Sequence, residues 1–186
     1  MAVAIRGRFR ADDIFDTPDD GKRYEVIDGD LYVTTAPDLD HQEPITELIG
    51  LIVPYLRRRP RGERGKLFTS PVGLILDEEN GLQPDLVYVS PARRGILTRR
   101  GIRGVPDLVL EVLSPGTEST DRGVKMRRYA AAGVAHYWIL DPATRVLEEY
   151  RLGEGGYRLT GTSGPGAVFR PEIFPGLEIP IDELWQ

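Results

Sequence analysis

The sequence contains no cysteine, which excludes disulfides, thiolate nucleophiles and cysteine-ligated zinc. It also contains no apolar run close to the roughly 20 residues that a membrane-spanning helix needs. The first ten residues include three arginines but no apolar core of the length found in signal peptides. We therefore expect a cytoplasmic protein without a membrane partner.

Lysine is scarce: the 24 basic residues include only three lysines, Lys22, Lys66 and Lys125. Lysine differs from arginine because its pKa can be lowered enough for it to act as a base or a compact proton donor. This scarcity is a mild indication that Lys125, which follows a group of acidic residues, has a chemical role.

The length of 186 residues and the hydrophobic content of 40% predict one soluble domain, residues 1–186, with a substantial core. Near the start, Asp28-Gly29 separates two short apolar segments and predicts a β-hairpin. Apolar residues at three- and four-residue spacing predict a helix over 39–59, with a kink or an early end at Pro54.

Two strands and a helix dominate the middle of the chain. Residues 85–89 and 107–113 are predicted strands, and the second is almost continuously apolar, as in a buried central strand. A helix over 119–132 and a strand over 135–140 follow. This strand–helix–strand order predicts an α/β (α+β) fold with a mixed sheet and a crossover helix. Further strands are predicted at 66–76, interrupted near Pro71 and Gly73, and at 145–151, 157–160 and 177–179.

The two central strands carry acidic residues. Alternate side chains of a strand share a face, so Asp85 and Glu111 converge at one end of the sheet if the strands are neighbours. Buried carboxylates are usually paired or hold a hard cation. Together with a backbone carbonyl, such as that of Val112, they would suit Mg²⁺ or Mn²⁺. Such an ion polarises a phosphodiester and lowers the pKa of a bound water.

Lys125 lies 14 residues after Glu111, on the predicted helix 119–132. From there its side chain can reach back over the end of the sheet, to orient or deprotonate the attacking water or to balance charge. Arg122 and Arg128 are one turn away and are candidate phosphate contacts. A purely structural alternative is a salt bridge from Glu111 to Lys125 or Arg128.

Several separated motifs resemble those of one known family and occur in its order. They are 23–31 (Arg-Tyr-Glu-Val-Ile-Asp-Gly-Asp-Leu), Pro84-Asp85, 110–115 (Leu-Glu-Val-Leu-Ser-Pro), 129–134 (Tyr-Ala-Ala-Ala-Gly-Val) and 137–142 (Tyr-Trp-Ile-Leu-Asp-Pro). Over about 12–184 the chain resembles the Uma-two family of putative restriction endonucleases, part of the PD-(D/E)xK nuclease superfamily.

The resemblance implies a restriction-endonuclease-like core, with a central mixed β-sheet flanked by helices and an N-terminal β-hairpin. It also implies Mg²⁺- or Mn²⁺-dependent cleavage of DNA, with Asp85 and Glu111 as metal ligands. A homodimer is expected because two sites are the simplest way to cut both strands of a duplex. The superfamily lysine, two residues after the second acid, is replaced here by Leu113. The resemblance therefore implies that Lys125 has taken over the third catalytic role.

Four more residues are candidates for the site, each with a structural alternative. Glu25 on the hairpin could contact a metal or water, or be a surface acid. His41 lies where the family has a recurrent histidine, although such a residue is more often a cap or a surface residue. Glu47 on the helix 39–59 could supply one more acid or simply face solvent. Asp107 shares the face of Glu111 but is expected to be structural.

Two other functions remain open. The acidic isoelectric point of about 5.2 and the missing strand lysine favour a catalytically silent nuclease-fold protein that binds nucleic acid or a protein partner. A metal-dependent phosphoesterase acting on a small substrate is the third possibility, and it predicts no salt-dependent affinity for DNA.

Overall fold

The computed structural model describes residues 3–185, and its centre is a six-stranded sheet in the order β12-β11-β10-β9-β7-β4. The parallel pair β9–β10 is joined by the predicted crossover helix, and the other neighbours are antiparallel, so the prediction of a mixed sheet is confirmed. The strands are β4 (Lys66–Thr69), β7 (Leu86–Val89), β9 (Leu108–Val112), β10 (His136–Asp141), β11 (Val146–Gly153) and β12 (Gly156–Ser163).

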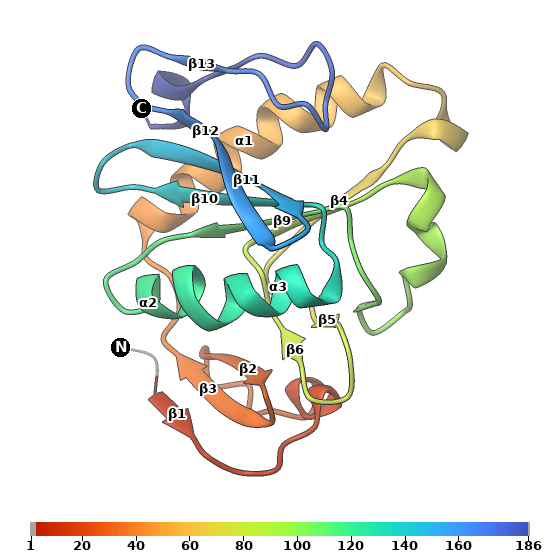
Figure 1. Cartoon of the computed structure of the whole chain (residues 1–186), viewed down its shortest axis with the longest axis vertical. Helices are drawn as coiled ribbons and strands as arrows, with labels where there is room; N and C mark the ends of the chain where they lie inside the picture. Colours follow the sequence, from red (N-terminus) through yellow and green to blue (C-terminus); the bar gives the residue numbers. More distant parts are fainter. Residues whose placement is uncertain (1–2, 186) are drawn as a thin grey trace.

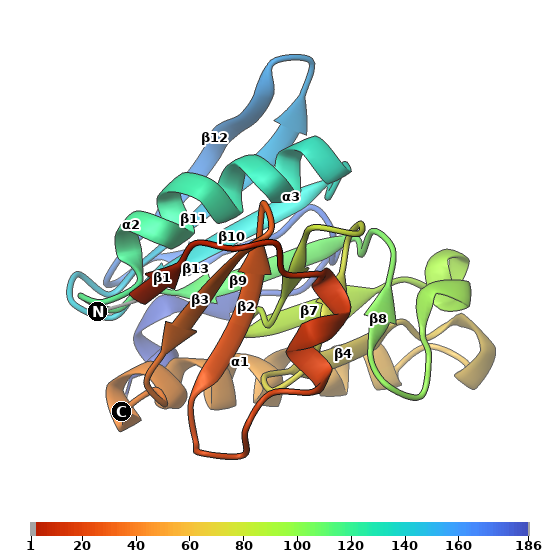
Figure 2. The same ribbon diagram turned by 90° about the horizontal axis from the view of Figure 1, so that it is seen from below.

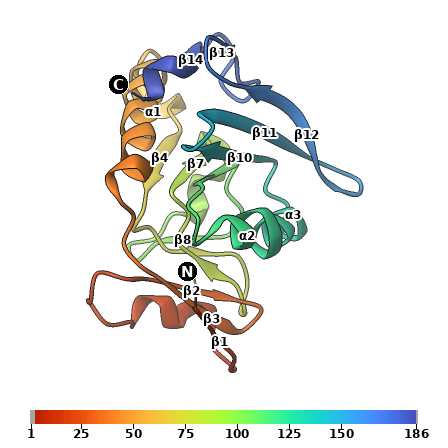
Figure 3. The same cartoon turned by 90° about the vertical axis from the view of Figure 1, so that its left-hand side faces the viewer.

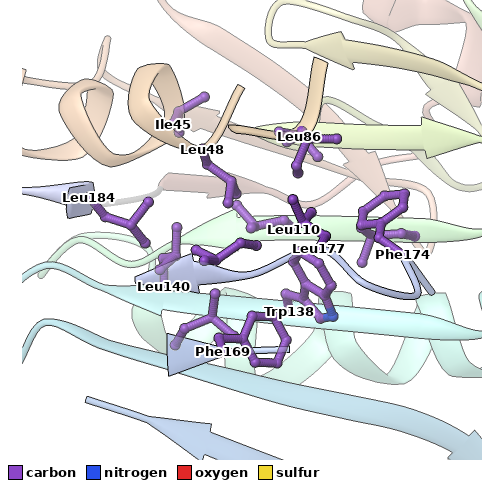
Figure 4. Packing of buried hydrophobic residues seen from close by; sticks show 14 of the residues in the cluster. Ile45, Leu48, Leu86, Leu110, Trp138, Leu140, Phe169, Phe174, Leu177 and Leu184 are labelled. Atoms are coloured by element: carbon purple, nitrogen blue, oxygen red, sulfur yellow. The ribbon is translucent and has the colours of Figure 1, made fainter. Parts of the chain in front are cut away.

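One face of this sheet is covered by helix α1 (Leu39–Arg57) and by the C-terminal segment (Figure 1). The helix buries the apolar stripe that its sequence spacing predicts. It continues through Pro54 and ends at Arg57, two residues before the predicted end, so it does not stop at the proline. The C-terminal segment consists of β13 (Val168–Phe169), β14 (Ile179–Pro180) and the short helix η5 (Ile181–Leu184). Figure 4 shows the core between α1 and the sheet, in which Leu48 of α1 lies with Leu110 and Trp138 of the sheet.

The opposite face is covered by one helical stretch and by a second sheet (Figure 3). The helical stretch runs through α2 (Glu118–Thr120), the π-helical turn η4 (Asp121–Lys125) and α3 (Met126–Ala132). The second sheet has the order β1-β3-β2-β6-β5-β8. Its strands are β1 (Val3–Ile5), β2 (Arg23–Ile27), β3 (Asp30–Thr34), β5 (Leu74–Ile75), β6 (Gly81–Leu82) and β8 (Ile102–Arg103).

The predicted hairpin is β2–β3, and its turn residues Asp28 and Gly29 both have positive φ, 57° and 75°. Figure 2 shows the three strands β1, β2 and β3 in front of the main sheet, beside the α2–α3 stretch. The predicted interruption of 66–76 is confirmed, because β4 joins the main sheet and β5 joins the second one. Three short helices complete the structure: η1 (Ala11–Phe15), η2 (Arg61–Glu63) and η3 (Pro91–Ile96). None of the helices in residues 3–185 has the length and apolarity to cross a membrane.

The register of β7 against β9 decides where the acidic residues lie. Val87 is opposite Val109, and Leu86 is opposite Leu110. Continuing this antiparallel register by one residue places Asp85 opposite Glu111. Val87 and Val109 pack toward the second sheet and α3, so the two acids lie on that face as well.

Candidate active site

Asp85 and Glu111 meet at one end of the β7–β9 strand pair, as the sequence predicts. Each residue is only 1% exposed. The backbone N–H of Val112 donates to Oδ2 of Asp85 at 2.8 Å, which ties the loop before β7 to the end of β9. A hydrogen bond to a charged carboxylate is among the stronger ones in proteins, so this contact fixes the position of Asp85.

Strand β2 of the second sheet contributes one basic and one acidic side chain to the region around Asp85 and Glu111. Arg23 and Glu25 are two residues apart and therefore share a face of the strand. Nη2 of Arg23 lies 2.6 Å from Oδ1 of Asp85, and Oε2 of Glu25 lies 3.0 Å from Nζ of Lys125. The other oxygen of Glu25 accepts from the backbone N–H of Gln83 at 2.9 Å.

Lys125 is enclosed by three carboxylates. Its Nζ lies 3.0 Å from Glu25, 3.3 Å from Glu111 and 3.1 Å from Asp121, and the residue is 2% exposed. Asp121 and Lys125 begin and end the π-helical turn, a feature often found at functional sites, and both side chains are buried. The hydroxyl of Tyr129, one turn further, donates to Oε1 of Glu111 at 2.7 Å. The predicted salt bridge between Glu111 and Lys125 is therefore present.

The buried cluster has more negative than positive charge. Its four carboxylates, those of Glu25, Asp85, Glu111 and Asp121, are each 1–2% exposed. Arg23 and Lys125 supply two positive charges, which leaves an excess of two negative charges when all four acids are ionised. Such an excess in a buried site is costly unless a further cation compensates it.

The pKa values follow from this charge balance. Burial raises the pKa of Glu111 well above its usual value, and the neighbouring carboxylates add to that effect while Lys125 opposes it. Burial likewise raises the pKa of Asp121. Burial alone would raise the pKa of Asp85 too, but Arg23 and His41 outweigh it and lower the pKa. Burial would lower the pKa of Lys125, but its three carboxylates raise it well above the usual value.

His41 contacts Asp85 from the first turn of α1. Its Nε2 lies 3.1 Å from Oδ2 of Asp85, and the residue is 6% exposed. Asp38 caps the helix by accepting from the backbone N–H of His41 at 3.1 Å, which holds this turn in place. The other ring nitrogen, Nδ1, has no hydrogen-bond partner among residues 3–185.

A pocket of about 200 Å³ opens beside these groups. Asp85, Asp121, Arg23 and His41 reach its wall, whereas Glu111 and Lys125 are not part of its lining. The remaining lining residues are Thr34, Thr35, Ala36, Pro37, Asp38, Ser114, Gly116 and Thr117. A small ligand could therefore reach the buried acids from the side of Asp85.

Four predicted candidates are not among the residues that line the pocket or contact the buried cluster. Asp107, at the opposite end of β9, accepts from the N–H of Ser90 at 2.6 Å and pairs with Arg93 at 3.2 Å. Glu47 is half-buried on α1, about 9 Å along the helix axis from His41, and does not line the pocket. Arg122 makes two contacts with Glu148, at 2.6 and 3.1 Å, and Arg128 pairs with Asp28 at 2.5 Å.

Arg23 and Asp121 belong to the cluster but were not predicted from the sequence. Spacing offered a signal for both. Arg23 shares a strand face with Glu25, and Asp121 lies four residues before Lys125, which brings two helix side chains together. Neither spacing is specific, because both are also common on solvent-exposed surfaces.

The cluster suits a divalent cation in the type of its donors and in its charge. Carboxylate oxygens are the ligands that Mg²⁺ and Mn²⁺ prefer, and the excess of two negative charges matches one such ion. Among residues 3–185, however, no three histidine, aspartate or glutamate side chains are already arranged to hold a metal. Arg23 and Lys125 contact oxygens of Asp85 and Glu111 that a metal would use.

Comparison with known proteins identifies a matching family and a similar fold. The family model Uma2, described as a putative restriction endonuclease, matches residues 11–182. The fold resembles the crystal structure of a putative nuclease belonging to DUF820 from Anabaena variabilis, with a TM-score of 0.74 and 19% sequence identity. That similarity covers 95% of this chain and 97% of the other, and it supports a nuclease-like α/β fold with a mixed sheet. No curated protein matches the sequence.

Proposed function

The chain belongs to the Uma2 family of putative restriction endonucleases, and we propose that it is a Mg²⁺- or Mn²⁺-dependent endonuclease that hydrolyses phosphodiester bonds in DNA. The observation that carries this proposal is the meeting of Asp85 and Glu111, from adjacent strands, beside a pocket. Two buried carboxylates at one sheet end match the acid positions that the family motif implies.

Asp85 and Glu111 would hold the metal ion, with the Val112 carbonyl as the proposed third donor from the protein. The bound ion would polarise the scissile phosphate and make a water molecule more acidic. The protein keeps these carboxylates in place through the N–H of Val112 and the hydroxyl of Tyr129. His41 adds a second contact to Asp85 and keeps its carboxylate oriented toward the pocket.

Lys125 has a narrower role in this proposal than a general base. Its pKa is raised, so it stays an ammonium ion at neutral pH and is a poor proton acceptor. It would instead compensate the charge of Glu111, Glu25 and Asp121 and hold Glu111 in position. Lys125 thus takes the place of the missing strand lysine as an electrostatic group.

A DNA cleavage assay with matched variants tests the proposal. Asp85→Asn and Glu111→Gln remove a metal-binding charge with little change of shape, and each is expected to lower single-turnover cleavage by about 10³-fold or more. Asp107→Asn is the matched control, because it alters the same residue type at the other end of the strand pair. The readout is conversion of supercoiled plasmid in Mg²⁺ and in Mn²⁺, together with a single-stranded substrate.

Equal cleavage by wild type, Asp85→Asn and Glu111→Gln would refute the assignment. An inactive wild type that still binds DNA would favour the silent nuclease-fold alternative, which the enclosed Lys125 and the presence of Leu113 in place of the strand lysine support. We also propose a homodimer, because cutting both strands of a duplex calls for two sites. Sedimentation velocity measures that association.

A further inference from the structure

Arg23 is paired with Asp85, which is one of the two cluster carboxylates, with Asp121, that line the pocket. Its guanidinium contacts Oδ1 of Asp85 at 2.6 Å and Oγ of Ser70 at 3.2 Å. The other oxygen of Asp85 is held by the N–H of Val112 and by His41. Each oxygen of Asp85 therefore already has a partner, and a cation that binds Oδ1 would share this oxygen with the guanidinium of Arg23.

We infer that Arg23 is a substrate phosphate-binding residue that Asp85 holds until a divalent cation takes its place. This inference rests on the proposed nuclease function. Of the partners of Asp85, Arg23 is the one whose departure suits a metal, because two cations at one carboxylate oxygen repel each other. The Val112 N–H is fixed by the strand backbone, whereas Arg23 is a long side chain with rotatable bonds.

The lining of the pocket supports a phosphate as the new partner of Arg23. Among the described residues that line the pocket, Arg23 is the only lysine or arginine. The same pocket is also lined by residues whose hydroxyl groups can donate to phosphate oxygens, namely Thr34, Thr35, Ser114 and Thr117, the hydroxyl groups of the last two being 3.0 Å from each other. A guanidinium presents paired N–H groups that match a phosphate well, and its side chain is already 11% exposed toward solvent.

The other basic residues near the cluster are less suited to this task. Lys125 contacts three carboxylates and does not line the pocket. Arg122 makes two contacts with Glu148, and Arg128 pairs with Asp28. Replacing Arg23 by a divalent cation also compensates the negative charge of the cluster. When Arg23 leaves, four carboxylates face one lysine, and a divalent cation more than replaces the lost charge.

Two substitutions separate this role from a merely structural one. Arg23→Gln removes the competing charge, so the free protein should bind Mn²⁺ about tenfold more tightly, because a like charge near the ion is gone. The same variant should cleave DNA at least about 100-fold more slowly at saturating Mn²⁺, because a phosphate contact is lost. Arg23→Lys keeps the charge, so its Mn²⁺ affinity should stay within about twofold of wild type, while cleavage falls about tenfold.

The experiment is a calorimetric Mn²⁺ titration without DNA, paired with single-turnover cleavage of a linear duplex. Arg93→Gln is the matched control, since it breaks another arginine–aspartate pair, at the opposite end of the β7–β9 strand pair, and should change neither quantity. Circular dichroism establishes whether each variant is folded. If Arg23→Gln does not fold, the cleavage rate of Arg23→Lys tests the inference instead. Unfolded Arg23→Gln combined with full cleavage by Arg23→Lys would count against the inference.

Tighter Mn²⁺ binding together with slower cleavage in Arg23→Gln is the expected pair of results. Unchanged or weaker Mn²⁺ binding by folded Arg23→Gln, or cleavage equal to wild type, overturns the inference. The nuclease proposal itself would survive that result if Asp85→Asn and Glu111→Gln still abolish cleavage. If those two variants cleave normally, the proposed function fails regardless of Arg23.

Discussion

The tetrapeptide Pro-Asp-Leu-Val occurs twice, at 84–87 and 106–109, and its two aspartates lie in contrasting environments. Because β7 and β9 are antiparallel neighbours, the two copies lie at opposite ends of one strand pair. The side chain of Asp85 is 1% exposed, whereas that of Asp107 is 21% exposed. The same local sequence thus produces one buried acid in a charged cluster and one acid near the surface.

The difference comes from parts of the chain that are distant in sequence. Asp107 is satisfied by Ser90 and Arg93, both within 17 residues of it. Asp85 is satisfied by Arg23, 62 residues away, by His41 in α1 and by the end of β9. A tetrapeptide sets the start of a strand and the face of its acid, while the packing of remote elements decides whether that acid becomes part of a site.

The largest expected effect on stability follows from replacing Lys125, which lies at the end of the β7–β9 strand pair where Asp85 is buried. Lys125→Met leaves Glu25, Glu111 and Asp121 without their shared cation, so the metal-free protein should lose about 3–5 kcal/mol of unfolding free energy. Urea denaturation in EDTA measures this loss. Arg93→Met at the other end of β9 is the control and should cost about 1 kcal/mol or less. Similar losses of unfolding free energy in Lys125→Met and Arg93→Met would contradict the contrast between the two ends of the strand pair.

Measuring unfolding free energy over a series of pH values compares Glu111 with Asp85 within the buried cluster. The pKa of Glu111 is raised in the folded protein, so above its ordinary value of 4.5 the folded state keeps a proton that the unfolded state has released. Stability from this group is therefore lost as pH rises. The unfolding free energy of wild type relative to Glu111→Gln should fall as the pH rises above about 5 in EDTA.

Asp85 should show the opposite trend. Its pKa is lowered in the folded protein, so its contribution is present above its ordinary value of 3.8 and is lost as pH falls. The advantage of wild type over Asp85→Asn should therefore decrease progressively as pH is lowered below about 5. Two trends of the same sign would show that the cluster does not separate these carboxylates as its contacts indicate.

Much of the fold could be predicted from the sequence. The Asp28-Gly29 turn located the hairpin, apolar residues at three- and four-residue spacing located α1, and apolar segments with their flanking turns and caps located the central strands and the crossover helix. Of the second sheet, only the hairpin and the segment that contains β5 were predicted as strands. Strands β6 and β8 are only two residues long, and such short segments have no periodicity to detect.

The candidate site was predictable in part, for a physical reason. The alternation of side chains along a strand and the family resemblance pointed to Asp85, Glu111 and Lys125. The structure brings all three into one cluster. Arg23 and Asp121 were missed because their role depends on the docking of β2 and of the π-helical turn, which no local pattern encodes. Arg122 and Arg128 were predicted from their distance to Lys125 along the helix, but acids from other elements pair with them.

The smallest expected effect belongs to the second copy of the tetrapeptide. Asp107→Asn weakens the ion pair with Arg93 but keeps an oxygen that can accept from the N–H of Ser90. Because this pair is partly exposed to solvent, its loss should cost about 1 kcal/mol or less. Asp85→Asn leaves Arg23 buried beside a neutral partner and should cost at least about twice as much. Urea denaturation of both variants at one pH gives the ratio, and an equal cost would mean that the two copies of the tetrapeptide are held in the same way.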